Sequence, residues 1–268
     1  MNILVCIKQV PDTTEIRIDP ITGTLIREGV TSIVNTYDTY ALEAAARIKD
    51  DYPESSITVL SMGPDSAESA LRDCLAVAAD RAFLITGKEF SGADTIATSY
   101  TLSEAIRHIE KLDGRCFDAV FCGKQAIDGD TAQVGPEIAE HLDIPQVTGA
   151  VQVTVDESKL IITRETRHGS EIIAAKMPCL VTFTKPAYVP RLATFRRKME
   201  ARKATITRIA ASEIHGLDVS SIGLKGSPTR VIKSSPANNK RKGVLYKGED
   251  AEKSAVFIAE VLHDLEVI

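Results

Sequence analysis

The sequence has 268 residues, of which 44% are hydrophobic and 26% are charged, and it contains no tryptophan. This composition is typical of a globular protein and excludes a largely disordered or collagen-like chain. The formal net charge of −5 argues against a dedicated nucleic-acid binder, and no apolar run reaches the roughly 18–20 residues that a membrane span needs. The N-terminal run MNILVCIKQVPD lacks a basic region and a small-residue cleavage site, so it is predicted to be a buried strand and not a signal peptide.

The first half of the chain alternates short apolar runs with longer stretches that have helical spacing. The apolar runs occupy residues 2–7, 57–61, 82–86 and 118–122. The helices predicted between them occupy residues 38–49, 66–78 and 94–109. Apolar strands without polar alternation are typical of a parallel sheet that helices cover on both faces. The sequence therefore predicts a doubly wound α/β fold.

The pattern changes after Pro145, where β-type runs follow one another with short polar turns between them. These runs occupy residues 147–155, 159–165, 170–175 and 178–183. Strands joined by such short turns pair antiparallel, so all four are predicted to extend the sheet as antiparallel strands. A last amphipathic helix is predicted at roughly residues 250–265.

Positive charge is concentrated in two segments that are predicted to be irregular. Residues 185–208 carry eight Lys or Arg and one acid, Glu200, and residues 225–248 carry seven Lys or Arg and no acid. One such segment alone is as well explained by a solvated loop, but two of them favour arms that reach a partner. Few aromatic residues accompany these charges, so the predicted partner is an acidic protein and not nucleic acid.

Five cysteines are scattered along the chain without a CxxC pair. They predict neither a disulfide framework nor a set of iron–sulfur ligands, but reduced thiols in a cytoplasmic protein. The five histidines are isolated and no HExxH motif occurs, so no metal site is predicted. Spacing supports no triad of nucleophile, base and acid, and no catalytic residue is predicted.

The loop after residue 122 is the strongest candidate for a ligand site. Ligands bind at the carboxyl ends of the strands in an open parallel sheet, yet the chain contains neither GxGxxG nor GxxxxGK[ST]. Residues 123–136 are mostly small and polar, and Pro136 with Glu137 is a good helix start. The loop offers amides, hydroxyls and carboxylates to a ribose or a pyrophosphate, although a plain capping loop explains it about as well.

Five motifs, in matching order and spacing, resemble those of the β subunit of electron-transfer flavoprotein (ETF). They read LVCIKQVPDT, VNTYDTYALEAA, LSMGP, GKQAIDGDTAQVGPEIAEHLDIPQVT and RETRHGSEIIAAKMPCLVT. The resemblance implies a HUP-type α/β fold with a mainly parallel sheet, an antiparallel extension and a C-terminal arm. It also implies an adenine nucleotide buried in this subunit and a heterodimer with an ETF alpha subunit.

The resemblance places the contacts to the adenine nucleotide at strand ends and in the loops that follow them. The implied cofactor-binding residues are Cys6, Lys8, Asn35, Tyr37, Asp38, Met62, Gly123, Lys124, Gln125, Ala126, Ile127, Asp128, Gly129, Asp130, Thr131, Ala132, Gln133 and Val134. Carboxylates of this loop and the Thr131 hydroxyl would serve sugar and phosphate oxygens. Lys8 and Lys124 would compensate the negative charge that those carboxylates bring near a phosphate.

Two features are similar to the electron-bifurcating group of the family, which holds FAD in this subunit where housekeeping members hold AMP. One is Asp38 of VNTYD, and the other is the segment 91–100. The local pattern alone favours a simple Asp N-cap on the helix that begins there, whereas the resemblance favours an uncovered helix N-terminus that suits a pyrophosphate. With the resemblance, NAD-binding residues are expected at Gly92, Asp94, Thr95 and Thr98.

The resemblance implies the following electron path. The FAD of this subunit accepts hydride from NADH, and one electron goes to ferredoxin or flavodoxin. The other electron goes through FAD of the alpha subunit to a flavin dehydrogenase, either of the acyl-CoA dehydrogenase type or a 2-hydroxy acid dehydrogenase. The alternatives are a non-bifurcating ETF beta subunit with structural AMP and a stand-alone HUP-type regulator that binds a nucleotide.

The basic segment falls where the family has its recognition loop for dehydrogenases. An apolar anchor ringed by cations would steer and hold such a partner, and the residues expected to do so are Arg191, Leu192, Phe195, Arg196 and Arg197. The predicted organisation is therefore a nucleotide-binding domain at 1–184, a recognition loop at 185–208, and a C-terminal arm at 209–268 that contacts the alpha subunit.

Overall fold

A computed structural model describes residues 1–12, 31–232, 246–248 and 250–265. The described residues belong to two compact units, which are treated separately below. The first is a body that ends at Ile232, and the second contains the described residues from Tyr246 onward. The predicted boundaries at residues 184 and 208 stay predictions.

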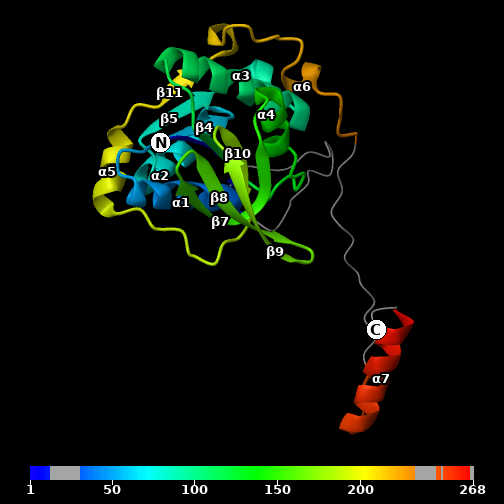
Figure 1. Cartoon of the computed structure of the whole chain (residues 1–268). Helices are drawn as coiled ribbons and strands as arrows, with labels where there is room; N and C mark the ends of the chain where they lie inside the picture. The colour runs from blue at the N-terminus through cyan, green and yellow to red at the C-terminus, as the bar shows by residue number, and fades with distance from the viewer. Residues whose placement is uncertain (13–30, 233–245, 249, 266–268) are drawn as a thin grey trace. The chain divides into compact units, whose positions relative to one another are not determined.

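The body is built on a nine-stranded sheet with the order β11-β5-β4-β1-β6-β10-β7-β8-β9 (Figure 1). The strands are β1 (Asn2–Cys6), β4 (Ser56–Met62), β5 (Arg81–Ile85), β6 (Ala119–Gly123), β7 (Gln146–Asp156), β8 (Lys159–Thr166), β9 (Gly169–Lys176), β10 (Cys179–Phe183) and β11 (Thr207–Ile209). Neighbours from β11 to β7 are parallel, whereas β8 pairs antiparallel with β7 and with β9. The predicted doubly wound α/β class with an antiparallel extension is confirmed.

The prediction for residues 178–183 is wrong in one respect. β10 does not extend the sheet as a fourth antiparallel strand, because it lies between β6 and β7 and runs parallel to both. All five of its residues are buried, which is typical of a central strand that is covered on both faces. The chain therefore leaves the β7-β8-β9 extension and returns to the parallel sheet.

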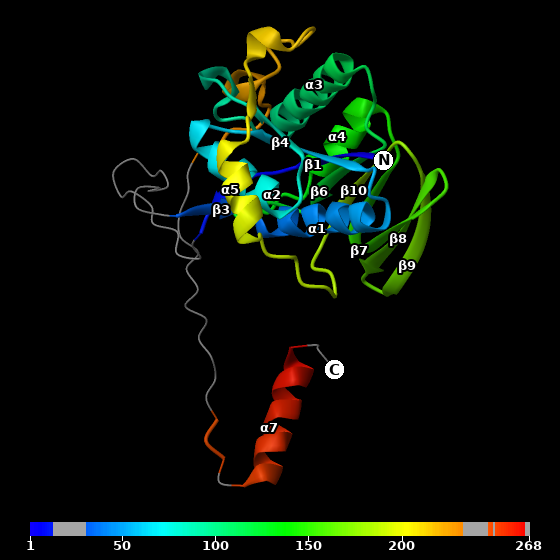
Figure 2. The same ribbon diagram turned by 90° about the vertical axis from the view of Figure 1, so that its left-hand side faces the viewer.

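Helices cover both faces of the sheet (Figure 2). Their bounds are α1 (Thr36–Asp51), α2 (Glu68–Val77), α3 (Thr95–Asp113), α4 (Val134–Leu142), α5 (Phe195–Lys203) and the short α6 (Gly223–Gly226), with 3₁₀ turns at Asp65–Ala67, Lys88–Phe90 and Ala211–Glu213. The apolar cluster on one face joins the strands to α1 and α2, and the cluster on the other face joins them to α3 and α4. The helices predicted in the first half of the chain are confirmed.

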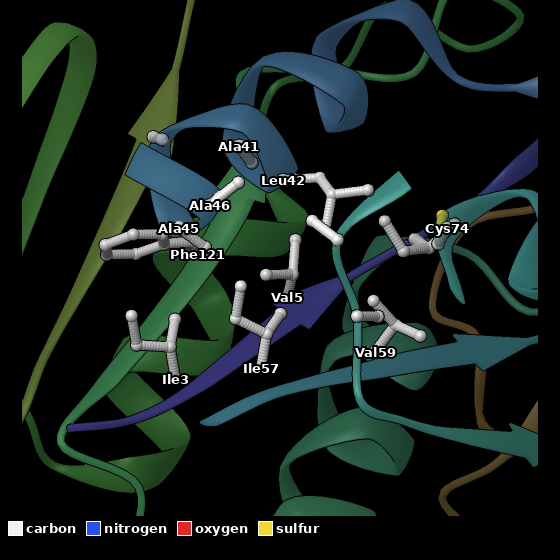
Figure 3. Close-up of a cluster of buried hydrophobic side chains, with 14 of the residues drawn as sticks. Ile3, Val5, Ala41, Leu42, Ala45, Ala46, Ile57, Val59, Cys74 and Phe121 are labelled. Carbon is white, nitrogen blue, oxygen red and sulfur yellow. The ribbon is translucent and has the colours of Figure 1, made fainter. Parts of the chain in front are cut away.

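The α1 face that contacts the sheet is rich in alanine. Ala41, Leu42 and Ala45 share one buried apolar cluster with Val5 of β1 and Val59 of β4, and Figure 3 shows these side chains between the helix and the strands. Small side chains let the helix backbone approach the strands closely, so α1 is held firmly from its first turn onward. This matters because the first turn of α1 carries part of the candidate site.

The prediction of an irregular segment at 185–208 is wrong in its second half, because α5 lies there. Arg72 of α2 donates hydrogen bonds to three carbonyl oxygens at the end of α5, those of Ala201, Arg202 and Ala204. Arg197 of α5 in turn donates to the carbonyl oxygens of Leu75 and Ala79 at the end of α2. Each helix thus supplies the arginine that caps the other, and the basic residues that suggested an irregular arm stabilise a helix pair.

The second unit contains the predicted last helix, α7 (Ala251–Asp264). Asp250 caps it by accepting a hydrogen bond from the Lys253 amide, and Tyr246 stacks on Phe257 with 4.4 Å between ring centroids. Most of the basic segment 225–248 lies outside the described residues. Among the helices that the structure describes, none has the length and apolarity needed to cross a membrane.

Candidate functional site

The strand order locates a crevice at the carboxyl ends of β1 and β6. The chain builds β4 and β5 on one side of β1 and then β6 and β10 on the other side, so the winding reverses between β1 and β6. In open α/β sheets, ligands bind outside the strand ends at such a reversal. A small antiparallel ribbon of β2 (Gln9–Pro11) and β3 (Ser32–Val34) follows β1 and brings Asn35 back to the strand end.

Asn35 fastens the loop after β6 to the start of α1. Its side chain is 1% exposed. The Asn35 amide donates to the Gln125 carbonyl at 2.9 Å and to Asp38 Oδ1 at 2.8 Å, and its Oδ1 accepts from the Ile127 amide at 3.0 Å. Asn35 therefore positions the loop through both ends of its side-chain amide.

Asp38 ties the ends of the two strands together. The residue is 6% exposed, and its carboxylate accepts a hydrogen bond from the Lys8 amide at 2.7 Å, while the Gly123 amide and the Asn35 side chain also donate to it. Burial raises the pKa of Asp38 to about 7, although these three donors act to lower it. Asp38 is thus a positioning residue between Lys8 and Gly123, and its oxygens do not face the crevice as free acceptors.

This carboxyl gives rise to a predicted pH dependence of stability. The unfolded chain releases the Asp38 proton near the ordinary pKa of 3.8, whereas the folded chain holds it up to about 7. In that window the folded state binds more protons, so the free energy of unfolding falls as the pH rises. Urea unfolding should show a fall of about 2–3 kcal/mol in the free energy of unfolding between about pH 5 and about pH 7.5 that is due to this group. Asp38→Asn should remove that part of the fall, and an unchanged pH dependence in the variant would assign it to another group.

The exposed half of the loop presents paired charges. Lys8 Nζ lies 2.6 Å from Asp128 Oδ1, and Gln125 Nε2 donates to Asp130 Oδ1 at 2.7 Å. The side chain of Lys124 is exposed, while its amide donates to the Phe183 carbonyl at 2.8 Å. Lys8 therefore compensates the negative charge of one of the two carboxylates, that of Asp128, as expected.

Two residues of the loop have left-handed backbone conformations without being glycine. Asp130 has φ 53° and Ala132 has φ 55°. Such conformations cost free energy and persist only where the surroundings hold them, and they gather at ligand sites. Thr131, between them, is exposed. The most strained part of the loop is thus the part that the resemblance assigns to sugar and phosphate contacts.

The expectation of an uncovered N-terminus on α3 is wrong. Asp94 Oδ1 accepts from the Ala97 amide at 3.0 Å as an N-cap, and Oδ2 accepts from the amide and the hydroxyl of Thr229 at 2.9 Å and 2.8 Å. The Asp94 amide donates to Ser227 Oγ, and a Cβ on Gly92 would lie 3.2 Å from Leu224. The segment around α6 covers this helix start, which sequence spacing could not reveal because more than 120 residues separate the two.

Thr95 is the residue of this group that approaches the loop. Its hydroxyl lies 3.1 Å from Glu137 Oε1 and 3.3 Å from Gln133 Oε1 at the start of α4. Thr98 is half-buried one turn further along α3. Thr95, one of the four residues expected to contact NAD, is therefore hydrogen-bonded to Gln133, which is expected to contact the nucleotide.

The remaining candidate residues lie around the crevice. Cys6 and Met62 are half-buried at the carboxyl ends of β1 and β4 and pack against the same apolar cluster, and Tyr37 is half-buried in the first turn of α1. A Cβ on Gly123 would lie 2.3 Å from Asp38 Oδ1, so the strand end and the helix start touch at this glycine. Among the described residues, no cluster of three or more Cys, His, Asp or Glu is arranged to hold a metal.

The residues expected to recognise a partner separate into two groups. Leu192 and Phe195 are 91% and 81% exposed. Arg191, by contrast, pairs with Glu43 at 2.8 Å and with Asp50 at 2.6 Å, both on α1, and these two carboxylates raise its pKa. Arg197 caps α2, as described above, and Arg196 forms an exposed pair with Glu200.

Sequence reasoning missed Glu43, which anchors this segment. Its side chain is 5% exposed and sits on the alanine-rich face of α1. A carboxylate among buried alanines needs a cation beside it, and this requirement is the feature of the sequence that could have identified Glu43. The Arg191 backbone amide also donates to Glu43 Oε2 at 3.0 Å. The segment that presents Leu192 is therefore held to α1 by both the backbone and the side chain of Arg191.

Comparisons with known proteins identify the family of the chain. The pattern described as the electron transfer flavoprotein domain matches residues 22–214. The chain is 50% identical to the electron transfer flavoprotein subunit beta of Thermoanaerobacterium thermosaccharolyticum, covering 94% of each chain. It is 47% identical to the subunit of the same name from Clostridium acetobutylicum, over 97% of this chain and 98% of that one. It is also 43% identical to the caffeyl-CoA reductase-Etf complex subunit CarD of Acetobacterium woodii, covering all of both chains.

Proposed function

The chain belongs to the electron transfer flavoprotein family as a beta-type subunit, and from this premise we propose that it holds FAD at the crevice of β1 and β6 and serves electron bifurcation. A beta subunit works in a redox complex, and its obligatory partner here is an ETF alpha subunit. The observation that carries the proposal is the network of Asp38. This residue, by which the sequence resembles the bifurcating group, joins the two strand ends at the centre of the crevice.

The residues of the crevice fit a dinucleotide. Gly123 leaves no side chain between the end of β6 and α1, and Asn35 holds the first part of the loop in place. Lys8 and Lys124 are the cations that would meet phosphate oxygens, and Thr131 presents an exposed hydroxyl between two strained residues. Exchange of the Lys8 contact from Asp128 to a phosphate would leave the Asp128 carboxylate free for a ribose hydroxyl.

FAD supplies chemistry that accepts a hydride and releases its two electrons one at a time. This chemistry suits NADH as the donor. It suits ferredoxin or flavodoxin as the acceptor of one electron, and the alpha-subunit FAD with a flavin dehydrogenase as the acceptors of the other. The chain itself orients the cofactor and sets its surroundings. Thr95 lies where α3 and α4 meet the loop, so it is the residue we expect beside NADH. Asp94 remains the cap of α3.

The nucleotide content of the co-purified alpha–beta heterodimer tests this proposal. The nucleotides are released by denaturation and separated by chromatography. Two FAD per heterodimer would support the proposal and lead to an assay of NADH-dependent ferredoxin reduction. One FAD and one AMP would identify a non-bifurcating subunit in which AMP occupies the crevice as a structural ligand.

Phe195 is predicted to be an anchor for the partner dehydrogenase. A buried aromatic anchor typically contributes at least 2 kcal/mol to an interface, so Phe195→Ala should raise the KM for the dehydrogenase about 30-fold. NADH reduction of the flavin should be unchanged, because Phe195 is exposed at the first residue of α5. Stopped-flow reduction and steady-state coupling assays measure the two quantities.

Ile172→Ala is a matched control, because Ile172 is an exposed apolar residue on β9, at the far edge of the sheet. It should leave both quantities unchanged. If Phe195→Ala slows flavin reduction and coupling together, the segment has a structural role and the proposed docking surface is wrong.

A further inference from the structure

Two cysteines lie side by side at the carboxyl ends of β1 and β6. Val5 is paired with Phe121 in the parallel register, so Cys6 and Cys122 follow at equivalent positions in the two strands. Both contact the same apolar cluster, which places their side chains on one face of the sheet. Both cysteines are free thiols in the structure.

Their separation suits a disulfide. Neighbouring strands of a sheet lie about 4.7–4.9 Å apart, and disulfides join Cα atoms that are about 4.4–6.8 Å apart. The two side chains lie on one face of the sheet at equivalent positions of neighbouring strands, so bond formation needs rotation of the side chains and little movement of the backbone. This pair differs from Cys74 and Cys179, which are buried on other elements without a neighbouring thiol in the described contacts.

The two thiols differ in their access to solvent. Cys122 is 5% exposed, and the hydrogen bond with Cys6 together with burial raises the pKa of the Cys122 thiol well above its usual range. Cys6 is half-buried, whereas the rest of β1 is buried, so its accessible surface lies at the carboxyl end of the strand. That end opens on the crevice, and Cys6 is therefore the thiol that a soluble reagent reaches first.

We propose that Cys6 and Cys122 form a dithiol at the floor of the crevice, which hydrogen peroxide oxidises to a disulfide when no nucleotide covers Cys6. The Cys6 sulfur attacks the peroxide, an S–O bond forms, the O–O bond breaks, and one water leaves. The Cys122 sulfur then attacks Cys6, the S–S bond forms, the S–O bond breaks, and a second water leaves. The two thiols lose two electrons in total, and the peroxide gains them.

The shielding by nucleotide rests on the proposed function, whereas the disulfide itself does not. Oxidation at this position would mark crevices that have lost their cofactor. Reduction by a small dithiol would restore them, because the product is a disulfide and not an over-oxidised thiol.

The experiment uses the full-length chain with its alpha subunit in a Cys116→Ser background. That substitution is needed because Cys116 and Cys122 fall in one tryptic peptide, residues 116–124, whereas Cys6 falls in residues 1–8. The heterodimer is stripped of nucleotide, checked for intact assembly by gel filtration, treated with hydrogen peroxide, alkylated and digested. Mass spectrometry should find residues 1–8 linked to residues 116–124, while Cys74 and Cys179 remain alkylated.

A second variant and a nucleotide titration complete the test. Cys122→Ser should give no linked peptide and leave Cys6 as a sulfenic acid that dimedone traps. FAD, and AMP in a separate series, at about ten times its dissociation constant should slow linkage about tenfold, because only the free form reacts. Linkage at the same rate with and without bound nucleotide would place the nucleotide away from Cys6 and contradict the shielding. Oxidation of Cys6 to sulfinic acid in the stripped protein without any linked peptide would overturn the dithiol.

Discussion

Gly123→Ala should abolish nucleotide retention and destabilise the body of the protein. The added Cβ would lie 2.3 Å from Asp38 Oδ1 and 2.7 Å from the backbone carbonyl carbon of Tyr37. The backbone of α1 cannot yield there, since the packing of its first turns on the sheet holds it in place. Overpacking of this kind costs about 1–3 kcal/mol, and the displaced strand end would also lose the hydrogen bond that the Gly123 amide donates to Asp38.

Gly129→Ala is the matched control, because Gly129 belongs to the same loop and a Cβ there would have nothing within 4 Å. The measurements are the nucleotide retained by the heterodimer after gel filtration and the urea midpoint of each variant. The control should keep the urea midpoint of the parent, because the added Cβ meets no other atom. Equal retention in the two variants would show that the contact between Gly123 and α1 does not shape the site.

Arg191→Ala should cost about 3 kcal/mol of stability and release the segment that carries Leu192. The substitution leaves Glu43, whose side chain is 5% exposed, as a buried carboxylate without its cation. Breaking a buried pair costs about 3–5 kcal/mol, and the lower end applies because a third of the Arg191 side chain is exposed. Urea unfolding measures the loss, and limited proteolysis between residues 185 and 194 should become faster.

The control is Arg196→Ala, which removes an arginine whose partner Glu200 is exposed. Exposed pairs of this type contribute about 0.3–0.5 kcal/mol, so stability should hardly change. A double variant, Arg191→Met with Glu43→Met, should recover most of the lost stability, because no unpaired charge is then buried. If Arg191→Ala lowers the free energy of unfolding no more than the control does, the ion pair with Glu43 does not anchor the segment.

Local signals predicted the sheet and its helices well. The apolar runs at β1, β4, β5 and β6 could only be buried strands, and the intervening helical spacing required helices on both faces. The strand order then located the candidate crevice without a phosphate-binding motif, since the reversal of winding follows from how the chain is laid down. Cys6, Lys8, Asn35, Asp38 and the loop from Gly123 all reach that crevice.

The features that sequence reasoning missed depend on contacts between distant segments. The short turns before β10 predict an antiparallel strand, although its unbroken apolar sequence, CLVTF, fits a central strand. Ser227 and Thr229 cover the N-terminus of α3, and no periodicity in the sequence connects these two residues to Asp94. The hydrogen bonds by which Asn35 and Asp38 hold the loop and the strand ends likewise depend on distant partners, which residue type alone does not predict.

The bonds of Asn35 and Asp38 also have a consequence for the timing of assembly. They join positions separated by 30, 90 and 92 residues along the chain. Contacts of such long range form only after the entropy of closing large loops has been overcome, so this corner is expected to be completed late in folding. Once completed, it is already rigid before any nucleotide arrives. A nucleotide bound there, as proposed, would meet a preorganised frame, and its affinity would not be reduced by the entropic cost of ordering the first part of the loop.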